Sequence, residues 1–347
     1  MGQKQTIILA IESSCDDTSA AVLKNDAVLS NLIAGQSVHS EYGGVVPELA
    51  SRAHLQNIVP VVDGAIKKAG ITKDEIDAIA FTKGPGLLGS LVVGTSFAKS
   101  MSLALDIPLI DVNHMYGHVL AHFIDDAGSD KPEFPFLCLT VSGGHTQIVL
   151  VRSPLDMEVI GTTIDDAAGE AFDKSAKVVG FDYPGGPLID KHAQNGDKKA
   201  FQFAKPRVDG FNYSFSGLKT SILYFIQKQE RENPQFISEN LNDLCASIQH
   251  SIIETLMKQL VKAADHHGIN NIAIAGGVSA NSGLRARIKE LGNSKGWKTF
   301  IPKFEYCTDN AAMIAITARF MFDEGLFTDQ TVSAKARVPF NPNGVKS

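Results

Sequence analysis

Two segments of the chain, 6–23 and 135–151, share one plan in which an apolar strand, a short polar turn and a second strand follow one another. The turn at 12–18 is rich in hydroxyls and carboxylates, and the turn at 142–145 reads Ser-Gly-Gly-His, whose glycines permit positive φ and leave room for a ligand. Either segment alone fits an ordinary hairpin, although backbone N–H groups at such a tip can approach a phosphate. Since the two lie about 130 residues apart and each opens one half of the chain, they predict a duplicated α/β fold with a nucleotide between the halves.

Length and cysteine usage bound the domain organisation. The chain has 347 residues, of which 44% are hydrophobic, so it can bury a large core but is too long for one compact unit. Two domains are therefore expected. The cysteines are far apart and form no Cys-x-x-Cys pair, which argues against a disulfide framework or a structural zinc knuckle; they are Cys15, Cys138, Cys245 and Cys307.

Charge and hydropathy indicate the compartment and the kind of partner. The net charge of -6 gives no global attraction to nucleic acid, so an RNA partner would need a local basic patch or another subunit. No apolar run approaches the ~20 residues of a membrane span, and the apolar piece at 7–11 is too short for a signal peptide. We therefore expect a cytoplasmic protein that does not interact with membranes.

Two histidines follow the apolar strand predicted at 108–112. His114 and His118 lie four residues apart, so both imidazoles project from one face of a helix and could bind one metal ion. Met115 stands where His-Glu-x-x-His has its glutamate, which excludes zinc-protease chemistry. Asp309, next to the helix predicted at 311–320, could complete the site as a hard anionic ligand. The alternative is structural: the histidines would cap or line their helix, and Asp309 would cap the last one.

A predicted helix that continues to about Ala69 offers further candidates. Glu48, Arg52 and His54 would face either a cleft or the solvent. The apolar positions of this helix have the spacing of a core face; they are Leu55, Ile58, Val59, Val62, Ala65 and Ile66.

Two later segments have features of ligand or RNA contacts. Aromatic, hydroxyl and lysine side chains at 211–220 could stack on and pair with RNA, although a solvated loop with core aromatics is the alternative. Basic residues stand upstream of this segment; they are Lys198, Lys199, Lys205 and Arg207. The strand predicted at 271–275 ends in a Gly-Gly turn against which a base or ribose could lie flat, with Asn281 able to donate and accept. Asp173 could accept a hydrogen bond from a ligand hydroxyl.

Nine motifs, in order along nearly the whole chain, resemble those of the TsaD family, the bacterial tRNA threonylcarbamoyladenosine synthases once labelled glycoproteases. They are Glu-Ser-Ser-Cys-Asp-Asp-Thr at 12–18, Gly-Gly-Val-Val-Pro-Glu-Leu-Ala-Ser-Arg at 43–52, Lys-Gly-Pro-Gly at 83–86, His-x-x-Gly-His at 114–118, Val-Ser-Gly-Gly-His-Thr at 141–146, Asp-Asp-Ala-Ala-Gly-Glu-Ala-Phe-Asp-Lys at 165–174, Ser-Phe-Ser-Gly-Leu-Lys-Thr at 214–220, Ala-Gly-Gly-Val-Ser-Ala-Asn at 275–281 and Cys-Thr-Asp-Asn at 307–310.

The resemblance implies an α/β fold of the actin/hexokinase/Hsp70 (ASKHA) type, with two duplicated lobes around a nucleotide cleft. The N-terminal lobe would span 1–129, with the segment 309–347 returning onto it, and the C-terminal lobe would span 130–308. The resemblance also implies one divalent metal. Fe²⁺ is expected and Zn²⁺ is the alternative, since both suit two imidazoles and a carboxylate.

Site residues are carried over by position. The metal ligands would be His114, His118 and Asp309. The residues that hold the phosphate and threonylcarbamoyl portion would be Thr140, Val141, Ser142, Gly143 and Gly144, and those that bind the nucleoside would be Asp173, Gly186, Asp190 and Asn281. Tyr116 departs from relatives, in which this position is often acidic; the ligands are intact, but a carboxylate supporting them from this position is missing.

The implied reaction transfers threonylcarbamoyl from threonylcarbamoyl-AMP to the exocyclic amine of the adenosine 3′ of the anticodon, in tRNAs reading codons that begin with A. Asp16 is the candidate to orient this amine or accept its proton; its alternative role is to hold the turn. The expected partners are tRNA, a TsaB-type paralogue and a TsaE-type ATPase. Three rival classes are a small-molecule kinase of the same superfamily, a metalloprotease and a non-catalytic scaffold.

Overall fold

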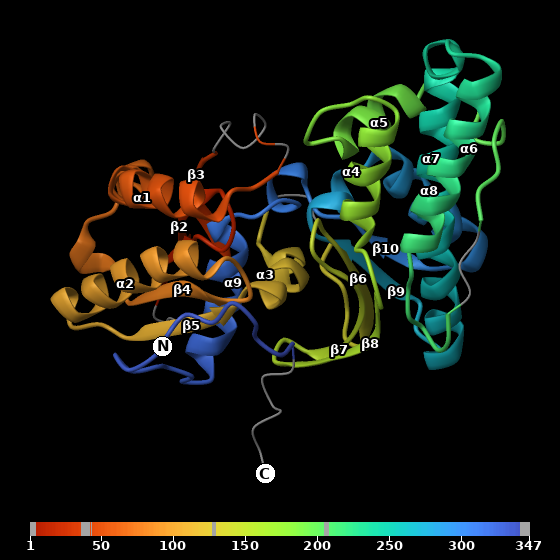
Figure 1. The fold of residues 1–347 in the computed structure, drawn as a ribbon. Helices are drawn as coiled ribbons and strands as arrows, with labels where there is room; N and C mark the ends of the chain where they lie inside the picture. The colour runs from red at the N-terminus through yellow and green to blue at the C-terminus, as the bar shows by residue number, and fades with distance from the viewer. Residues whose placement is uncertain (1–4, 36–41, 43, 127–129, 205–207, 341–347) are drawn as a thin grey trace. The chain divides into compact units, whose positions relative to one another are not determined.

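The computed structural model describes residues 5–35, 42, 44–126, 130–204 and 208–340. The chain forms two compact units, each built on its own sheet (Figure 1). Unit 1 comprises residues 1–131, 153–157 and 302–347, and unit 2 comprises residues 132–152 and 158–301. Unit 1 thus contains the N-terminal part of the chain, the short segment 153–157 and the C-terminal part.

The five-stranded sheet of unit 1 contains the first predicted hairpin. Its strands are β1 (Ile7–Glu12), β2 (Thr18–Lys24), β3 (Ala27–Ala34), β4 (Ala78–Gly84) and β5 (Leu109–Asn113), in the order β3-β2-β1-β4-β5. β1 pairs antiparallel with β2 and parallel with β4, which in turn pairs parallel with β5. The prediction of a hairpin at 6–23 is confirmed.

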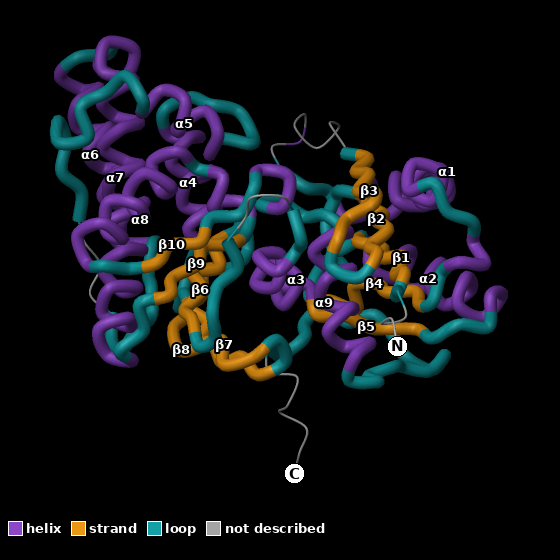
Figure 2. Tube along the Cα trace, turned by 180° about the vertical axis from the view of Figure 1, so that it is seen from behind, coloured by secondary structure: helices purple, strands orange, loops and turns teal. Residues whose placement is uncertain are grey.

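Helices cover both faces of this sheet. All six residues of β1 are therefore buried. On one face lie α1 (Pro47–Ala69) and α2 (Leu88–Leu105), whose apolar side chains pack with alternate residues of β1. On the other lies α9 (Ala311–Asp323), which packs against β1, β2 and the short helix α3 (His114–Leu120) (Figure 2). The connecting 3₁₀ turns of unit 1 are η2 (Lys73–Glu75), η3 (Ala121–Phe123) and η5 (Phe304–Tyr306).

The core face predicted for the first helix was too wide. Of its six positions, Leu55 and Val59 are 65% and 60% exposed, whereas the other four are buried. The exposed pair and the residues Leu88 and Val92 of the neighbouring helix α2 are large apolar side chains left facing outward. We call these four residues the α1–α2 apolar face.

Helix α2 qualifies one expectation about membranes. It is the one described helix that is long and apolar enough to span a bilayer by length and composition, with a third of it buried, so the prediction that no apolar run approaches a span was too strict. Core helices of soluble proteins have the same length and composition, and α2 packs on β4 and α1.

Unit 2 repeats the strand arrangement of unit 1. Its strands are β6 (Phe136–Val141), β7 (Thr146–Ser153), β8 (Asp156–Thr162), β9 (Asn271–Ala275) and β10 (Lys298–Phe300), in the order β10-β9-β6-β7-β8. β6 pairs antiparallel with β7 and parallel with β9. Both sheets thus have a central strand that forms a hairpin on one side and a parallel pair on the other, as the duplicated pattern predicted.

The helices of unit 2 are α4 (Ala168–Val178), α5 (Gly186–Ala193), α6 (Ser216–Glu232), α7 (Phe236–His267) and α8 (Ser282–Lys295), with a 3₁₀ turn η4 (Gly277–Ala280). Helix α7 is interrupted near its start by a non-helical residue, Asn240. The apolar stripe of α4 and its C-cap belongs to the core of unit 2; its members are Ala168, Ala171, Phe172, Ala176 and Val179.

The prediction of RNA stacking by the aromatics of 211–220 is contradicted for two of them. Tyr213 and Phe215 are fully buried in the core of unit 2, and helix α6 begins directly after them. Lys198 and Lys199 upstream are exposed, whereas Lys205 and Arg207 lie outside the described residues. The aromatic spacing therefore reflects core packing, which was the alternative interpretation.

Candidate functional site

The predicted ligands His114, His118 and Asp309 lie together in unit 1. One potential ligand atom from each lies within 4.8 Å of the others. Asp309 Oδ1 is 3.4 Å from His114 Nε2 and 3.2 Å from His118 Nε2. Within the described residues, this is the one group of three or more His, Cys, Asp and Glu side chains with such spacing. A cluster of two imidazoles and one carboxylate fits a divalent transition metal.

Local sequence explains why the histidines project toward Asp309. Strand β5 ends at Asn113, whose side chain accepts a hydrogen bond from the Met115 N–H and so starts helix α3. One turn of this helix separates His114 from His118, and their rings meet edge to face with centroids 4.8 Å apart. Both imidazoles are therefore held on one face by the helix itself.

Asp309 is not the cap of the last helix. The cap of α9 is Asn310, whose side chain accepts from the Met313 N–H at 3.1 Å. This contradicts the structural alternative for Asp309, because the neighbouring amide satisfies the helix terminus and leaves the carboxylate directed at the imidazoles.

The burial of His118 is a second observation that supports metal ligation. Its side chain is 1% exposed, and neither of its ring nitrogens has a hydrogen bond with good geometry to any residue that the structure describes. A buried imidazole without such bonds is costly, whereas a metal ion would satisfy the nitrogen that faces Asp309. The residues present therefore fit the metal that the family resemblance implies.

Without a metal, the cluster is an ion-pair network. Burial opposes ionisation of Asp309, but the two imidazoles outweigh it and hold the pKa of this carboxyl well below its usual range. Burial likewise opposes protonation of His114, yet the carboxylates of Asp309 and Glu12 raise its pKa well above 6.5. In the metal-free protein, a proton on His114 thus supplies positive charge that a bound metal ion would otherwise supply.

Glu12 is a residue of this site that the sequence alone did not single out. It ends β1, is fully buried and places Oε2 3.1 Å from His114 Nδ1. Ser14 N–H donates to Oε1 and Thr82 Oγ1 donates to Oε2, both at 2.5 Å. Burial opposes its ionisation, but the His114 imidazole outweighs this effect and lowers the pKa of Glu12. The available signal was a charged residue at the end of an otherwise apolar strand.

The candidate base, Asp16, lies in the β1–β2 turn of the same unit. His54 fixes this turn, since its buried imidazole contacts Thr18 Oγ1 at 2.7 Å and the Cys15 carbonyl at 3.0 Å. His54 thus supports the turn from inside. Burial, followed by the charges of Asp16, Asp309 and Glu12, raises the pKa of the neighbouring Asp17 to about 7.

The β6–β7 turn of unit 2 contains the residues predicted to hold the donor's phosphate and threonylcarbamoyl portion. Thr140 and Val141 are buried at the end of β6, whereas Gly143 and Gly144 are exposed at the tip. Neither glycine has positive φ, contrary to one reason given for them, but a Cβ at either position would meet no atom within 4 Å. The second reason, open space for a ligand, agrees with the structure. Ser142 Oγ accepts from the His145 N–H and closes the turn.

Each hairpin turn packs against a glycine turn from the neighbouring parallel strand. A Cβ on Gly86, after β4, would lie 2.4 Å from the Ser14 carbonyl oxygen. A Cβ on Gly276, after β9, would lie 2.5 Å from the Val141 carbonyl oxygen, and this glycine has φ +87°. The same close backbone approach therefore recurs in both units.

The four residues predicted to bind the nucleoside lie on α5 or beside it in unit 2. Asp173 Oδ1 accepts from the N–H groups of Gly185 and Gly186, at 2.9 and 3.0 Å. One helical turn later, Asp190 accepts from the N–H and hydroxyl of Ser282, the residue after Asn281. The structure thus brings these residues together within unit 2.

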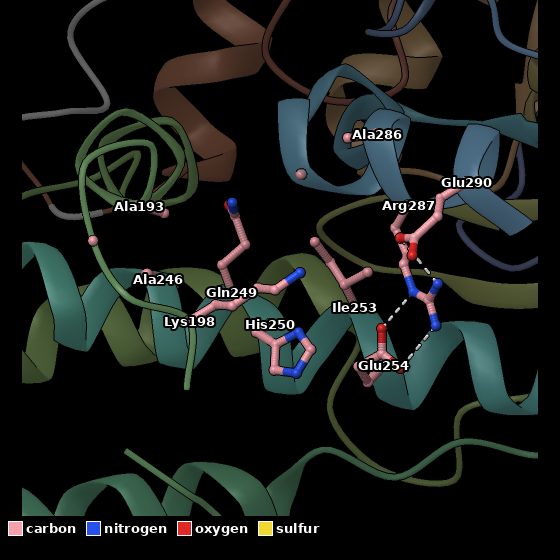
Figure 3. Close-up of a pocket in the computed structure, with 12 residues that line it drawn as sticks. Ala193, Lys198, Ala246, Gln249, His250, Ile253, Glu254, Ala286, Arg287 and Glu290 are labelled. Atoms are coloured by element: carbon pink, nitrogen blue, oxygen red, sulfur yellow. Dashed lines mark hydrogen bonds and ion pairs between the residues drawn. The ribbon is translucent and has the colours of Figure 1, made fainter. Parts of the chain in front are cut away.

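Asn281 already has two internal partners. Its Oδ1 accepts from the Leu284 N–H at the start of α8, and its Nδ2 donates to Gln249 Oε1 at 2.7 Å. Gln249 also lines a cavity of about 230 Å³ beside α5, α7 and α8 (Figure 3). Across that cavity Arg287 pairs with Glu254 at 2.6 Å.

Comparison with solved structures identifies the fold. A crystal structure of full-length HypF in a phosphate- and nucleotide-bound form matches 93% of this chain with a TM-score of 0.63 at 14% identity, and the chain spans about half (47%) of HypF. Component A of (R)-2-hydroxyglutaryl-CoA dehydratase from Acidaminococcus fermentans matches 92% of this chain and 98% of its own, with a TM-score of 0.51 at 12% identity. With its two five-stranded sheets, the chain has the predicted α/β fold of the ASKHA type.

Comparison of sequences is more specific. A relative from Riemerella anatipestifer is 62% identical over 97% of this chain and 99% of its own length, and one from Porphyromonas gingivalis is 63% identical over 94% and 96%. Each is called tRNA N6-adenosine threonylcarbamoyltransferase. A family model with that same description, TsaD, matches residues 27–316. The chain therefore belongs to the TsaD family of tRNA N6-adenosine threonylcarbamoyltransferases.

Proposed function

We propose that this protein transfers the threonylcarbamoyl group of threonylcarbamoyl-AMP to the exocyclic amine of the adenosine 3′ of the anticodon, in tRNAs reading codons that begin with A. Membership of the TsaD family supports the reaction class, since relatives over nearly the whole chain carry this activity in their names. The observation that carries the proposal is the convergence of His114, His118 and Asp309, because a TsaD-type transferase is expected to require a metal centre there.

The metal centre would consist of these three side chains and one divalent ion, Fe²⁺ in the first instance and Zn²⁺ as the alternative. When bound, such an ion supplies a Lewis acid for the phosphate and carbamoyl oxygens of the donor. The absence of a glutamate beside His114 removes the water-activating base of a metalloprotease, so acyl transfer to an amine is the chemistry we assign.

Unit 2 would bind the donor. The β6–β7 turn, with Thr140, Val141, Ser142, Gly143 and Gly144, would hold the phosphate and threonylcarbamoyl portion, which the open space over both glycines supports. The nucleoside would be bound by Asp173, Gly186, Asp190 and Asn281, which their position on or beside α5 supports. Asp190 and Asn281 also order the start of α8, so their removal would disturb the shape of the nucleoside site as well as its contacts.

The proposed transfer forms one bond, breaks one bond and releases one proton. The N6 amine of adenosine attacks the carbamoyl carbon, the bond from that carbon to the phosphate oxygen breaks, and AMP leaves with the bonding electrons. The amine loses one proton, and we assign Asp16 the role of orienting the amine or accepting that proton. Its position in a turn fixed by His54 supports this role, because a base must be held in place to act.

We also propose that the protein works in the cytoplasm with a TsaB-type paralogue and a TsaE-type ATPase. The α1–α2 apolar face (Leu55, Val59, Leu88 and Val92) supports a protein partner on unit 1, because these large apolar side chains are left exposed on two helices that pack against each other. The TsaB-type paralogue is the partner we assign to this face.

The proposal is tested by nucleoside mass spectrometry of unmodified tRNA after incubation with the purified protein, both partners, threonylcarbamoyl-AMP and ATP. We expect threonylcarbamoyladenosine with the wild-type protein and none with His118→Ala. The matched control Glu324→Gln changes an exposed glutamate of unit 1, at the end of α9 away from Asp309, and should leave the yield unchanged. No product from the wild-type protein with demonstrably active partners would refute the proposed reaction. Full activity of His118→Ala would instead refute the metal centre.

A further inference from the structure

Both ring nitrogens of His114 have close polar neighbours, the one that faces Asp309 and the one that faces away from it. His114 Nε2 lies 3.4 Å from Asp309, and the opposite ring nitrogen, Nδ1, lies 3.1 Å from Glu12 Oε2. Ser14 Oγ approaches the same nitrogen at 3.1 Å. The ring is therefore contacted by a carboxylate at each end, only one of which belongs to the proposed ligand set.

Glu12 is placed for this contact by two strands and one turn. It is 0% exposed, and both of its oxygens accept hydrogen bonds, Oε1 from the Ser14 N–H and Oε2 from Thr82 Oγ1 of β4. A fully buried carboxylate destabilises the folded protein unless hydrogen bonds and an opposite charge compensate for its lost hydration. The backbone and hydroxyl donors fix its orientation, and His114 supplies the remaining partner.

We propose that Glu12 is a positioning residue for the metal centre, which fixes His114 in the tautomer with a proton on Nδ1 and so keeps Nε2 free to bind the ion. This inference rests on the proposed metal site. Histidine ligands commonly donate their other ring N–H to a carboxylate, which fixes the ring and makes the ligating nitrogen more basic. Glu12, at the end of β1, thus provides the supporting carboxylate that Tyr116, on the ligand helix, cannot.

Tyr116 has a different role in the structure. Its ring stacks on Phe340 at 5.1 Å between centroids, and its buried hydroxyl has no hydrogen-bond partner in the described part of the chain. It packs behind the helix and does not contact the histidine rings through any described interaction. The carboxylate support is therefore supplied by a strand that is adjacent in space and distant in sequence.

The test measures Zn²⁺ affinity, by competition with a chromogenic chelator, in the full-length protein and five variants. Glu12→Gln and Glu12→Ala should each weaken binding by about 10- to 100-fold. Ser14→Ala, which removes the other group near Nδ1, should change it by less than about threefold. His118→Ala should abolish binding, and the exposed control Glu324→Gln should match the wild type. Circular dichroism establishes that each variant is folded.

Wild-type affinity in folded Glu12→Gln would overturn the positioning role while leaving the metal site intact. Absence of Zn²⁺ binding by the wild type, or unchanged binding by His118→Ala, would overturn the metal site itself. A second measurement does not depend on any variant folding. Nitrogen-15 NMR of histidine-labelled, Zn²⁺-loaded wild-type protein should show His114 with a proton on Nδ1, and a proton on Nε2 would overturn the inference.

Discussion

Asp309 Oδ1 lies 3.2 Å from His118 Nε2, although the two residues come from distant parts of the sequence. Replacing Asp309 by Asn removes the only negative charge of the proposed ligand set. We expect loss of bound metal, measured by mass spectrometry of the metal content, and a fall in transfer rate of about 100-fold or more. Asn310→Ala is the matched control: it removes the α9 cap and should cost about 1 kcal/mol of stability without changing the metal content.

Asp17 should make the stability of the metal-free protein depend on pH. Its pKa is raised from the ordinary value of 3.8 to about 7, so the folded protein holds a proton that the unfolded chain releases. Between these two values the folded state binds more protons, and the free energy of unfolding should therefore fall as pH rises from about 4 to about 7. Urea unfolding at both ends of this window should show a smaller fall for Asp17→Asn. An identical pH dependence in that variant would contradict the assignment.

Gly86→Ala should destabilise unit 1, because the added Cβ would lie 2.4 Å from the backbone carbonyl oxygen of Ser14. We expect a loss of about 3 kcal/mol in the free energy of unfolding. The comparison variant is Gly217→Ala in α6, where a Cβ meets nothing within 4 Å, and which should gain about 0.5 kcal/mol. Equal midpoints in chemical denaturation for the two variants would show that the turn can move aside at no cost.

Gly143→Val should separate folding from donor binding. A Cβ at this position would meet no atom within 4 Å, so the denaturation midpoint should stay close to that of the wild type. The same side chain would occupy the space proposed for the donor, and the KM for threonylcarbamoyl-AMP should rise about tenfold or more, equivalent to about 1.4 kcal/mol. A wild-type KM would place the donor elsewhere.

Leu55→Glu and Val59→Glu should weaken binding of the TsaB-type partner without unfolding the protein, since both side chains are mostly exposed. Truncating or charging a central interface residue commonly costs about 2 kcal/mol or more, so we expect at least a roughly 30-fold weaker Kd in calorimetry. Tyr224→Glu on α6 of unit 2, an equally exposed position, should leave the Kd unchanged. Loss of binding in this control would indicate a different interface.

The two hairpins and the strands at 108–112 and 271–275 were predictable, because a short apolar run that ends in a polar or glycine-containing turn is a local signal. The helices were predictable in position but not in orientation. On α1 the apolar stripe covers more positions than the sheet can bury, so Ile58 and Val62 enter the core while Leu55 and Val59 do not. Which edge of a wide stripe is buried depends on the angle at which the helix meets the sheet, and no local pattern encodes that angle.

The site shows the same division between local and distant information. The spacing of His114 and His118 is local, so their shared helix face could be predicted directly. The choice between Asp309 and Asn310 as cap of α9 depended on which of two adjacent polar residues reaches the Met313 N–H. Glu12 could not be assigned to His114 from spacing. Their contact joins the end of β1 to the residue that follows β5, and β4 lies between these two strands in the sheet.

Unit 1 is discontinuous in the chain, since α9 packs on β1 and β2 and is separated from them by all of unit 2. During synthesis the ribosome must therefore release all of unit 2 before this helix can dock on the first sheet. Asp309, which shortly precedes α9, arrives at the same moment. A nascent chain can thus present two histidines throughout the synthesis of unit 2, but it can acquire a complete metal centre only once Asp309 and α9 have emerged.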